Sequence, residues 1–114
     1  MASPELRAEI EAFFVGTGWT PYFVEGSDPE TMHQAMAATV EQCISEIKKC
    51  QREARSSGIA VRPRWPMIVL RTPKGWTCPK EIDGKRTEDY WRSHQVPMGE
   101  MHENPAHVRI LEEW

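Results

Sequence analysis

The hydrophobic positions of this chain first recur at helical spacing. Apolar side chains between Leu6 and Phe14 fall on one face of a helix. The pair Ser3-Pro4 is typical of a helix start, because serine caps the free N–H groups and proline tolerates the first turn. Gly16 follows the last apolar position. The pattern therefore predicts a short N-terminal helix that ends at this glycine.

Two short apolar runs then flank a longer helical stripe. Residues 21–25 and 66–71 read as strands, and residues 29–56 as an amphipathic helix that begins with a second cap-then-proline pair and stops before Gly58. The stripe that we expect to face the core consists of Met32, Met36, Val40, Cys43, Ile44, Ile47 and Ala54. The order strand, helix, strand predicts one βαβ unit.

The second strand carries four consecutive apolar residues, at positions 67–70, which predicts burial on both of its faces. A helical connection of this length implies parallel strands and a right-handed crossover. The loops that follow the two strands, residues 25–28 and 72–76, should then lie at the same edge of the sheet.

Regular periodicity disappears between residues 77 and 101. Within this stretch, residues 82–85 read as a tight turn or a small hairpin. Trp76, Tyr90 and Trp91 argue against disorder, because their large apolar surfaces require cover. We therefore expect a long, irregular but ordered loop.

A third helix is predicted after the pair Asn104-Pro105, with apolar positions continuing to Trp114. The apolar pattern of this helix continues to the last residue of the sequence. We interpret the chain, residues 1–114, as a truncated part of one α/β domain.

Composition narrows the functional classes. Charged residues make up 27% and apolar residues 39%, and the net charge is −3, so no general attraction to nucleic acid or anionic membrane is expected. No apolar run is long enough to span a bilayer, and the start is not that of a signal peptide. Cys43, Cys50 and Cys78 lack the spacing of a zinc site or a disulfide framework, which favours a reducing, cytoplasmic setting.

The candidate chemistry begins where the second strand ends. Lys74 and Gly75 follow it directly, and ligands of open α/β sheets bind at the carboxyl ends of strands. From the residues alone, a solvated lysine and a simple turn remain the commoner interpretation. The loop at residues 25–28 is likewise explained by a turn and a helix cap.

Four segments resemble the phosphoketolase family: V-E-G-S-D-P-E, M-H-Q-A-M-A-A-T, W-P-M-I-V-L-R-T-P-K-G-W-T and H-Q-V-P. The resemblance runs from about Glu11 to Trp114, and Cys78 stands where the family more often has glycine. It implies that the chain is part of a thiamine-diphosphate-binding, transketolase-like α/β domain with a parallel sheet. This portion of the domain supplies one βαβ unit, a long irregular loop and a C-terminal helix.

The resemblance also implies a reaction. Phosphoketolases cleave xylulose 5-phosphate or fructose 6-phosphate with inorganic phosphate, giving acetyl phosphate and an aldose phosphate. Thiamine diphosphate and Mg²⁺ are the implied cofactors. The implied partners are the ketose phosphate, inorganic phosphate and the remainder of a phosphoketolase chain that forms a homo-oligomer, with no nucleic acid or membrane.

By the same resemblance, Lys74 and Gly75 match positions near the cofactor, and His94 and Gln95 match catalytic ones. An imidazole can donate to a substrate oxygen and carry a proton near neutral pH. Lacking a family counterpart, His102 and His107 are expected to face solvent. No Gly-Asp-Gly stretch followed by asparagine is present, so the metal ligands are expected outside this chain, and the chain alone is expected to be inactive.

Two other classes stay open at this stage. A stand-alone phosphate or sugar-phosphate binding module would use the two strand-end loops. A nucleic-acid binder is suggested by basic residues around an aromatic one (Arg62, Arg64, Trp65 and Arg71), although the acidic net charge argues against it.

Overall fold

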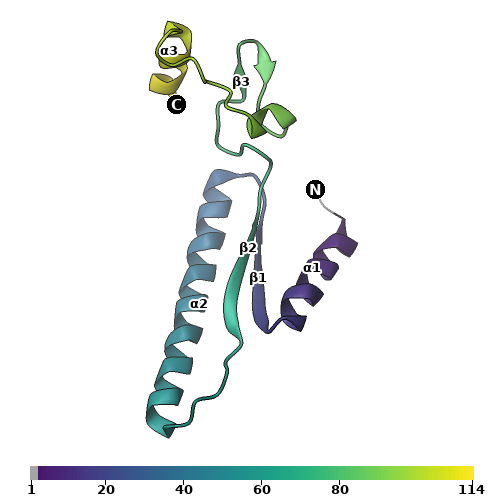
Figure 1. The fold of residues 1–114 in the computed structure, drawn as a ribbon, viewed down its shortest axis with the longest axis vertical. Helices are drawn as coiled ribbons and strands as arrows, with labels where there is room; N and C mark the ends of the chain where they lie inside the picture. The colour runs from purple at the N-terminus through teal and green to yellow at the C-terminus, as the bar shows by residue number, and fades with distance from the viewer. Residues whose placement is uncertain (1–2) are drawn as a thin grey trace. The chain divides into compact units, whose positions relative to one another are not determined.

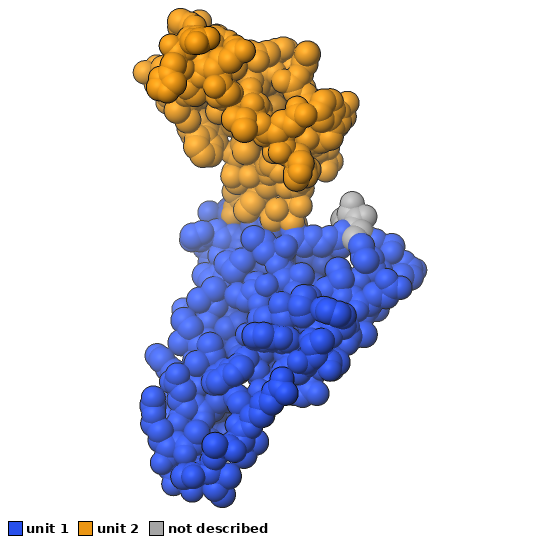
Figure 2. Space-filling view, in the orientation of Figure 1, with its two compact units in different colours: residues 1–25, 30–71 blue, residues 26–29, 72–114 orange. Residues whose placement is uncertain are grey.

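The structure, a computed structural model, describes residues 3–114. Its contacts divide these residues into two compact units (Figure 2). Unit 1 holds the chain up to Glu25 together with Glu30–Arg71, and unit 2 holds Gly26–Pro29 together with Thr72–Trp114. Each unit has its own buried residues.

Unit 1 is the predicted βαβ unit preceded by a helix (Figure 1). Its elements are α1 (Pro4–Gly16), β1 (Trp19–Glu25), α2 (Pro29–Ser57) and β2 (Trp65–Arg71). The two strands pair in parallel over their full length, from Trp19 opposite Trp65 to Glu25 opposite Arg71. The parallel pairing predicted from the helical crossover is confirmed, and both strands end at the same level.

Helix α1 begins and ends as its sequence predicts. The Ser3 hydroxyl accepts a hydrogen bond from the Leu6 N–H at 3.3 Å, which satisfies one of the free donors of the first turn. Arg7 on this helix lies over the ring of Phe23 on β1, 4.7 Å from its centroid. Its guanidinium also pairs with Glu25 at 3.7 Å. These contacts hold α1 against the first strand.

Helix α2 places part of its predicted stripe in the interior. Met32 and Cys43 are buried, and the hydroxyl of Tyr22 on β1 donates to the carboxylate of Glu46 on α2. Burial raises the pKa of the Cys43 thiol, so this cysteine stays neutral and packs as a small apolar side chain. Among residues 3–114, neither this helix nor any other is sufficiently apolar over a sufficient length to cross a membrane.

The expectation that strand residues 67–70 are buried on both faces is wrong for this chain. Met67, Ile68 and Val69 are half-buried, and Leu70 is 51% exposed. The cause is the size of the sheet: β2 has one neighbouring strand, β1, among the described residues. A two-stranded sheet offers an apolar run too little cover.

Unit 2 contains the predicted hairpin and the third helix. Strands β3 (Glu81–Ile82) and β4 (Lys85–Arg86) pair antiparallel, with Glu81 opposite Arg86. A short 3-10 helix, η1 (Trp91–His94), and helix α3 (Pro105–Glu113) follow. Asn104 caps α3 by accepting from the Ala106 N–H at 3.0 Å. The irregular loop is therefore ordered, and the chain as a whole is of mixed α/β class.

The interior of unit 2 corrects one sequence expectation. His107 is only 2% exposed, whereas the sequence predicted a solvent-facing side chain. Its Nε2 lies 3.0 Å from both carboxylate oxygens of Asp83 in the β3–β4 turn, so a charged partner compensates its burial. His102 is exposed, as expected.

Candidate functional site

The two strand-end loops meet within unit 2. The indole Nε1 of Trp76 donates to the backbone carbonyl of Ser27 at 2.8 Å, across 49 positions of sequence. The expectation that the loops after the two strands come together is thereby confirmed, and the strand ends from which they start, Glu25 and Arg71, are opposite each other. In parallel sheets the carboxyl ends of strands are the ends from which ligand-binding loops start.

Lys74 and His94, two of the site residues expected from the family resemblance, lie in contact. The Nζ atom of Lys74 is 3.0 Å from Nδ1 of His94. An ammonium group has donors only, so Nδ1 must accept this hydrogen bond. A neutral His94 then carries its proton on Nε2, and it presents that N–H away from Lys74 as a donor.

An open hollow of about 540 Å³ surrounds this contact. Its lining residues come from the turn after β2 and from the segment that leads into η1 and out of it: Lys74, Asp89, Tyr90, Trp91, His94 and Gln95. Gln95 follows η1, and its backbone N–H donates to the Arg92 carbonyl at 3.1 Å. Three of the expected site residues therefore line one concave surface.

Gly75, the fourth expected site residue, holds the turn against η1. Its φ is +68°, a conformation that favours glycine. A Cβ atom at this position would lie 2.5 Å from Cβ of Ser93, the residue before His94. The absence of a side chain therefore permits a close approach between the Lys74 turn and the helix that carries His94.

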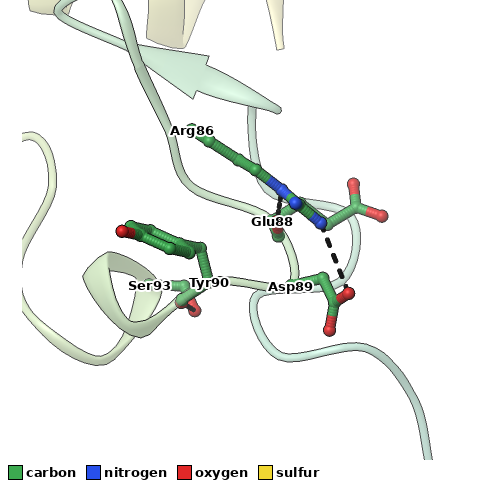
Figure 3. Close-up of polar contacts among 5 residues, drawn as sticks. All are labelled: Arg86, Glu88, Asp89, Tyr90 and Ser93. Atoms are coloured by element: carbon green, nitrogen blue, oxygen red, sulfur yellow. Dashed lines mark hydrogen bonds and ion pairs between the residues drawn. The ribbon is translucent and has the colours of Figure 1, made fainter. Parts of the chain in front are cut away.

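A polar network on the β4 side fixes the segment before η1 (Figure 3). Arg86 donates from Nε to the Glu88 carbonyl at 3.0 Å, and its Nη2 lies 3.3 Å from Oδ2 of Asp89. The Asp89 N–H in turn donates to the Lys74 carbonyl at 2.7 Å. The Tyr90 carbonyl accepts from both the N–H and the hydroxyl of Ser93, at 3.1 and 2.8 Å. These bonds connect the β3–β4 hairpin to the segment before η1, and that segment to the turn that carries Lys74.

Sequence reasoning missed part of the hollow. Asp89 was assigned no role, and Tyr90 and Trp91 were expected to be covered, yet they are 44% and 56% exposed. Trp76, the third of these aromatics, is half-buried. A usable signal was the position of Asp89, Tyr90 and Trp91 directly before the H-Q-V-P segment.

The Lys74 side chain of the hollow suits an anion, while Asp89 adds a carboxylate to the same lining. Within unit 2, the Lys74 ammonium forms no ion pair with a carboxylate, and its side chain contacts a neutral acceptor instead. Such a cation is free to bind phosphate oxygens. A metal ion has no comparable site, because residues 3–114 contain no cluster of three or more histidine, cysteine or acidic side chains arranged to hold one.

The comparisons with known proteins agree on one family. Residues 3–114 match the family model described as XFP N-terminal domain. The chain is 70% identical over 106 residues to a probable phosphoketolase of Synechocystis sp., covering 93% of this chain and 13% of that protein. It is 65% identical over 119 residues to probable phosphoketolase 1 of Nostoc sp., covering all of this chain and 15% of the relative. The chain therefore spans about one seventh of these relatives' length.

Proposed function

This chain belongs to the phosphoketolase family, as part of its N-terminal domain, and we propose that it supplies one wall of a phosphoketolase active site. The parent enzyme would cleave a ketose phosphate, xylulose 5-phosphate or fructose 6-phosphate, with inorganic phosphate. Its products would be acetyl phosphate and an aldose phosphate. The contact between Lys74, in the turn that follows β2 in sequence, and His94 is the observation that carries this proposal.

Lys74 has the charge that the reaction needs. Its ammonium, unpaired with any carboxylate in unit 2, balances the negative charge of a diphosphate or of a substrate oxyanion. Thiamine diphosphate, when bound, supplies the carbanion chemistry of the cleavage. Lys74 and Gly75 are the residues of this chain that would lie against it, while Mg²⁺ would take its ligands from the rest of the parent chain.

His94 is placed to act on a substrate oxygen. With Nδ1 accepting from Lys74, its Nε2–H can donate to that oxygen and pass a proton during loss of water from the two-carbon unit. Gln95, beside it in the hollow, offers an amide donor and acceptor that can orient the same unit. These roles require both residues to touch the substrate.

The partners of the site follow from the same proposal. The remainder of the phosphoketolase chain would close the hollow and cover exposed apolar side chains such as Phe13 and Leu70. Identical subunits would associate, as the family resemblance implies. The free cysteines Cys43, Cys50 and Cys78 favour action in the cytoplasm.

The test uses the full-length parent enzyme with thiamine diphosphate and Mg²⁺. Acetyl phosphate formed from each ketose phosphate and inorganic phosphate is measured for wild type, Lys74→Ala and His94→Ala. We expect each substitution to lower turnover about a hundredfold, as for a lost electrostatic or acid–base group. The matched controls Lys80→Ala and His102→Ala remove an exposed side chain outside the hollow and should leave turnover unchanged.

The proposed function and the proposed site residues are contradicted by different results. A wild-type enzyme that forms no acetyl phosphate from any ketose phosphate would contradict the function. Near-normal turnover by Lys74→Ala or His94→Ala, with cofactor bound, would instead contradict the assignment of the site.

A further inference from the structure

Half of the hollow has no role in the proposed chemistry. Besides Lys74, His94 and Gln95, it is lined by Asp89, Tyr90 and Trp91. This part combines a carboxylate with two aromatic rings, next to the cation that attracts an anion. Small-molecule sites commonly combine aromatic walls with a few well-placed polar groups.

The backbone of Asp89 is held at this wall, and its side chain is 68% exposed. Its N–H donates to the Lys74 carbonyl at 2.7 Å, which fixes the residue beside the turn that carries the cation. Its φ is +54°, in the left-handed region that aspartate tolerates better than most residues. Arg86 contacts Oδ2 at 3.3 Å, and Figure 3 shows this single link from the guanidinium to the Asp89 side chain. Oδ1 therefore remains available to accept further hydrogen bonds.

The aromatic part of the wall is exposed. Trp91 is 56% and Tyr90 44% exposed, and their ring centroids lie 5.8 Å apart at an interplanar angle of 46°. The Tyr90 ring lies beside the indole, and more than half of the Trp91 side chain is not covered by other residues of this chain. A flat apolar surface of this kind gains free energy when carbon-bound hydrogens of a ligand cover it.

We propose that Asp89 and Trp91 bind the polyol chain of the ketose phosphate, with the Asp89 carboxylate accepting from its hydroxyls and the Trp91 indole packing against its carbon backbone. This inference rests on the proposed function, and it assigns to the same site the residues that select the sugar. The carboxylate has acceptors only, so it favours the hydroxyl donors of a polyol. Inorganic phosphate has no carbon backbone to cover the indole, so this wall is expected to act on the sugar substrate.

The test measures KM for each substrate separately in the intact enzyme. Asp89→Asn keeps the shape and tolerates the positive φ, but it replaces one acceptor with a donor. We expect KM for the ketose phosphate to rise about tenfold, as for a lost hydrogen bond to a charged group, with KM for inorganic phosphate unchanged. Glu88→Gln removes the neighbouring carboxylate, which does not line the hollow, and should change neither constant.

Two substitutions at Trp91 compare the loss of the whole side chain with the replacement of the indole by a smaller aromatic ring. Trp91→Ala should raise KM for the ketose phosphate by about tenfold with little effect on turnover, while Trp91→Phe should retain most of the affinity because a ring remains. Calorimetry of the cofactor-free enzyme provides a second readout. Binding of the product aldose phosphate, which keeps the carbons and hydroxyls beyond the cleaved bond, should weaken in parallel in Asp89→Asn and Trp91→Ala.

The outcomes separate this inference from the proposed function. A wild type that makes acetyl phosphate, with variants whose KM for the ketose phosphate is unchanged, overturns the inference alone. A rise confined to KM for inorganic phosphate would also overturn it, since the wall would then face the other substrate. A wild type without acetyl phosphate production removes the premise. If Trp91→Ala fails to fold, Trp91→Phe and Asp89→Asn still decide the question.

Discussion

Nζ of Lys74 lies 3.0 Å from Nδ1 of His94, although 20 positions separate the two residues in sequence. The backbone turn that permits this contact depends on Gly75, and the contact sets which nitrogen of His94 carries the proton. The two side chains are therefore expected to act as one unit.

The first prediction concerns this coupling. In the full-length enzyme, the double variant Lys74→Ala/His94→Ala should lose much less activity than the product of the two single losses. The reason is that removing either residue already misplaces the other, and contacting residues are not additive. The measurement is kcat/KM for the four proteins of the cycle. The pair Lys80→Ala and His94→Ala serves as the control, in which effects should simply multiply. Multiplicative losses for Lys74 and His94 would show that the two act independently.

The second prediction compares two glycines of unit 2. Gly75 and Gly84 have nearly the same positive φ, +68° and +67°, but only a Cβ at Gly75 meets a neighbour, Ser93. Gly84→Ala should cost only the backbone strain, about 1 kcal/mol. Gly75→Ala should cost more and lower turnover, because the Lys74 turn must move away from η1. Hydrogen exchange over residues 72–95 of the intact enzyme measures the local loss of protection.

A rescue variant tests the steric part of this argument. Adding Ser93→Gly to Gly75→Ala removes the atom that the new Cβ would meet at 2.5 Å. Protection should return most of the way to the level of Gly84→Ala, since only backbone strain and the lost bond from the Ser93 hydroxyl to the Tyr90 carbonyl remain. Equal exchange in the Gly75 and Gly84 variants would contradict the close approach.

The third prediction concerns the pair formed by buried His107 and exposed Asp83 in unit 2. His107→Ala leaves the Asp83 carboxylate without its partner, and it should lower local stability by about 2 kcal/mol, the range for a hydrogen bond to a charged group. Because the pair joins α3 to the hairpin turn, amide exchange should rise in both elements together. The exposed His102→Ala is the control and should leave exchange unchanged. Faster exchange in α3 alone would indicate that the pair does not fasten the hairpin.

The fourth prediction is a pH dependence in unit 1. The hydrogen bond to Glu46 raises the pKa of the Tyr22 hydroxyl, since a phenolate would face a carboxylate. The protonated form is thus favoured by folding, and its contribution is complete below the ordinary tyrosine value of about 10. It is lost as the pH rises through the higher pKa of the folded state. Wild type should therefore be more stable than Tyr22→Phe at pH 8, with a difference that shrinks above about pH 10. Urea unfolding of the intact enzyme and its Tyr22→Phe variant, followed by far-UV circular dichroism, measures the difference, and a constant difference would refute this origin.

The fifth prediction concerns the 114-residue chain by itself. Phe13 is 64% and Leu70 51% exposed, and both strands of the sheet have a free edge among the described residues. Such surfaces favour association, so the chain should self-associate, unfold without a sharp transition and form no acetyl phosphate. Sedimentation analysis, and calorimetry with thiamine diphosphate and Mg²⁺, measure these properties. A sharply melting monomer that binds the cofactor tightly would contradict this prediction.

The elements of the fold were predictable where their signals are local. Ser3-Pro4 and Asn104-Pro105 mark two helix starts by cap and proline, and Asp83-Gly84 marks the hairpin turn. The parallel pairing followed from the length of the helical connection alone. Local chemistry and connectivity were enough to predict the βαβ unit and the edge at which its loops meet.

Other features depend on residues that are distant in sequence. The burial of His107 was missed because its partner, Asp83, lies 24 positions earlier, and a lone histidine carries no sign of such a pair. The four-residue helix η1 is too short for its periodicity to be visible. The exposure of Leu70 was missed because an apolar run predicts a neighbour on each side, and the sheet of this chain has one. The roles of Lys74 and His94 came from the family resemblance and stay predictions.

The hydrogen bond from Trp76 to Ser27 has a consequence for the order of folding. It joins residues 49 positions apart, so closing it early would cost a large loop entropy. Once α2 has formed and the two strands have paired, the strand ends Glu25 and Arg71 are already opposite each other and most of that cost has been met. We therefore expect the loop that carries Lys74 to order late, with the crossover helix as its kinetic prerequisite.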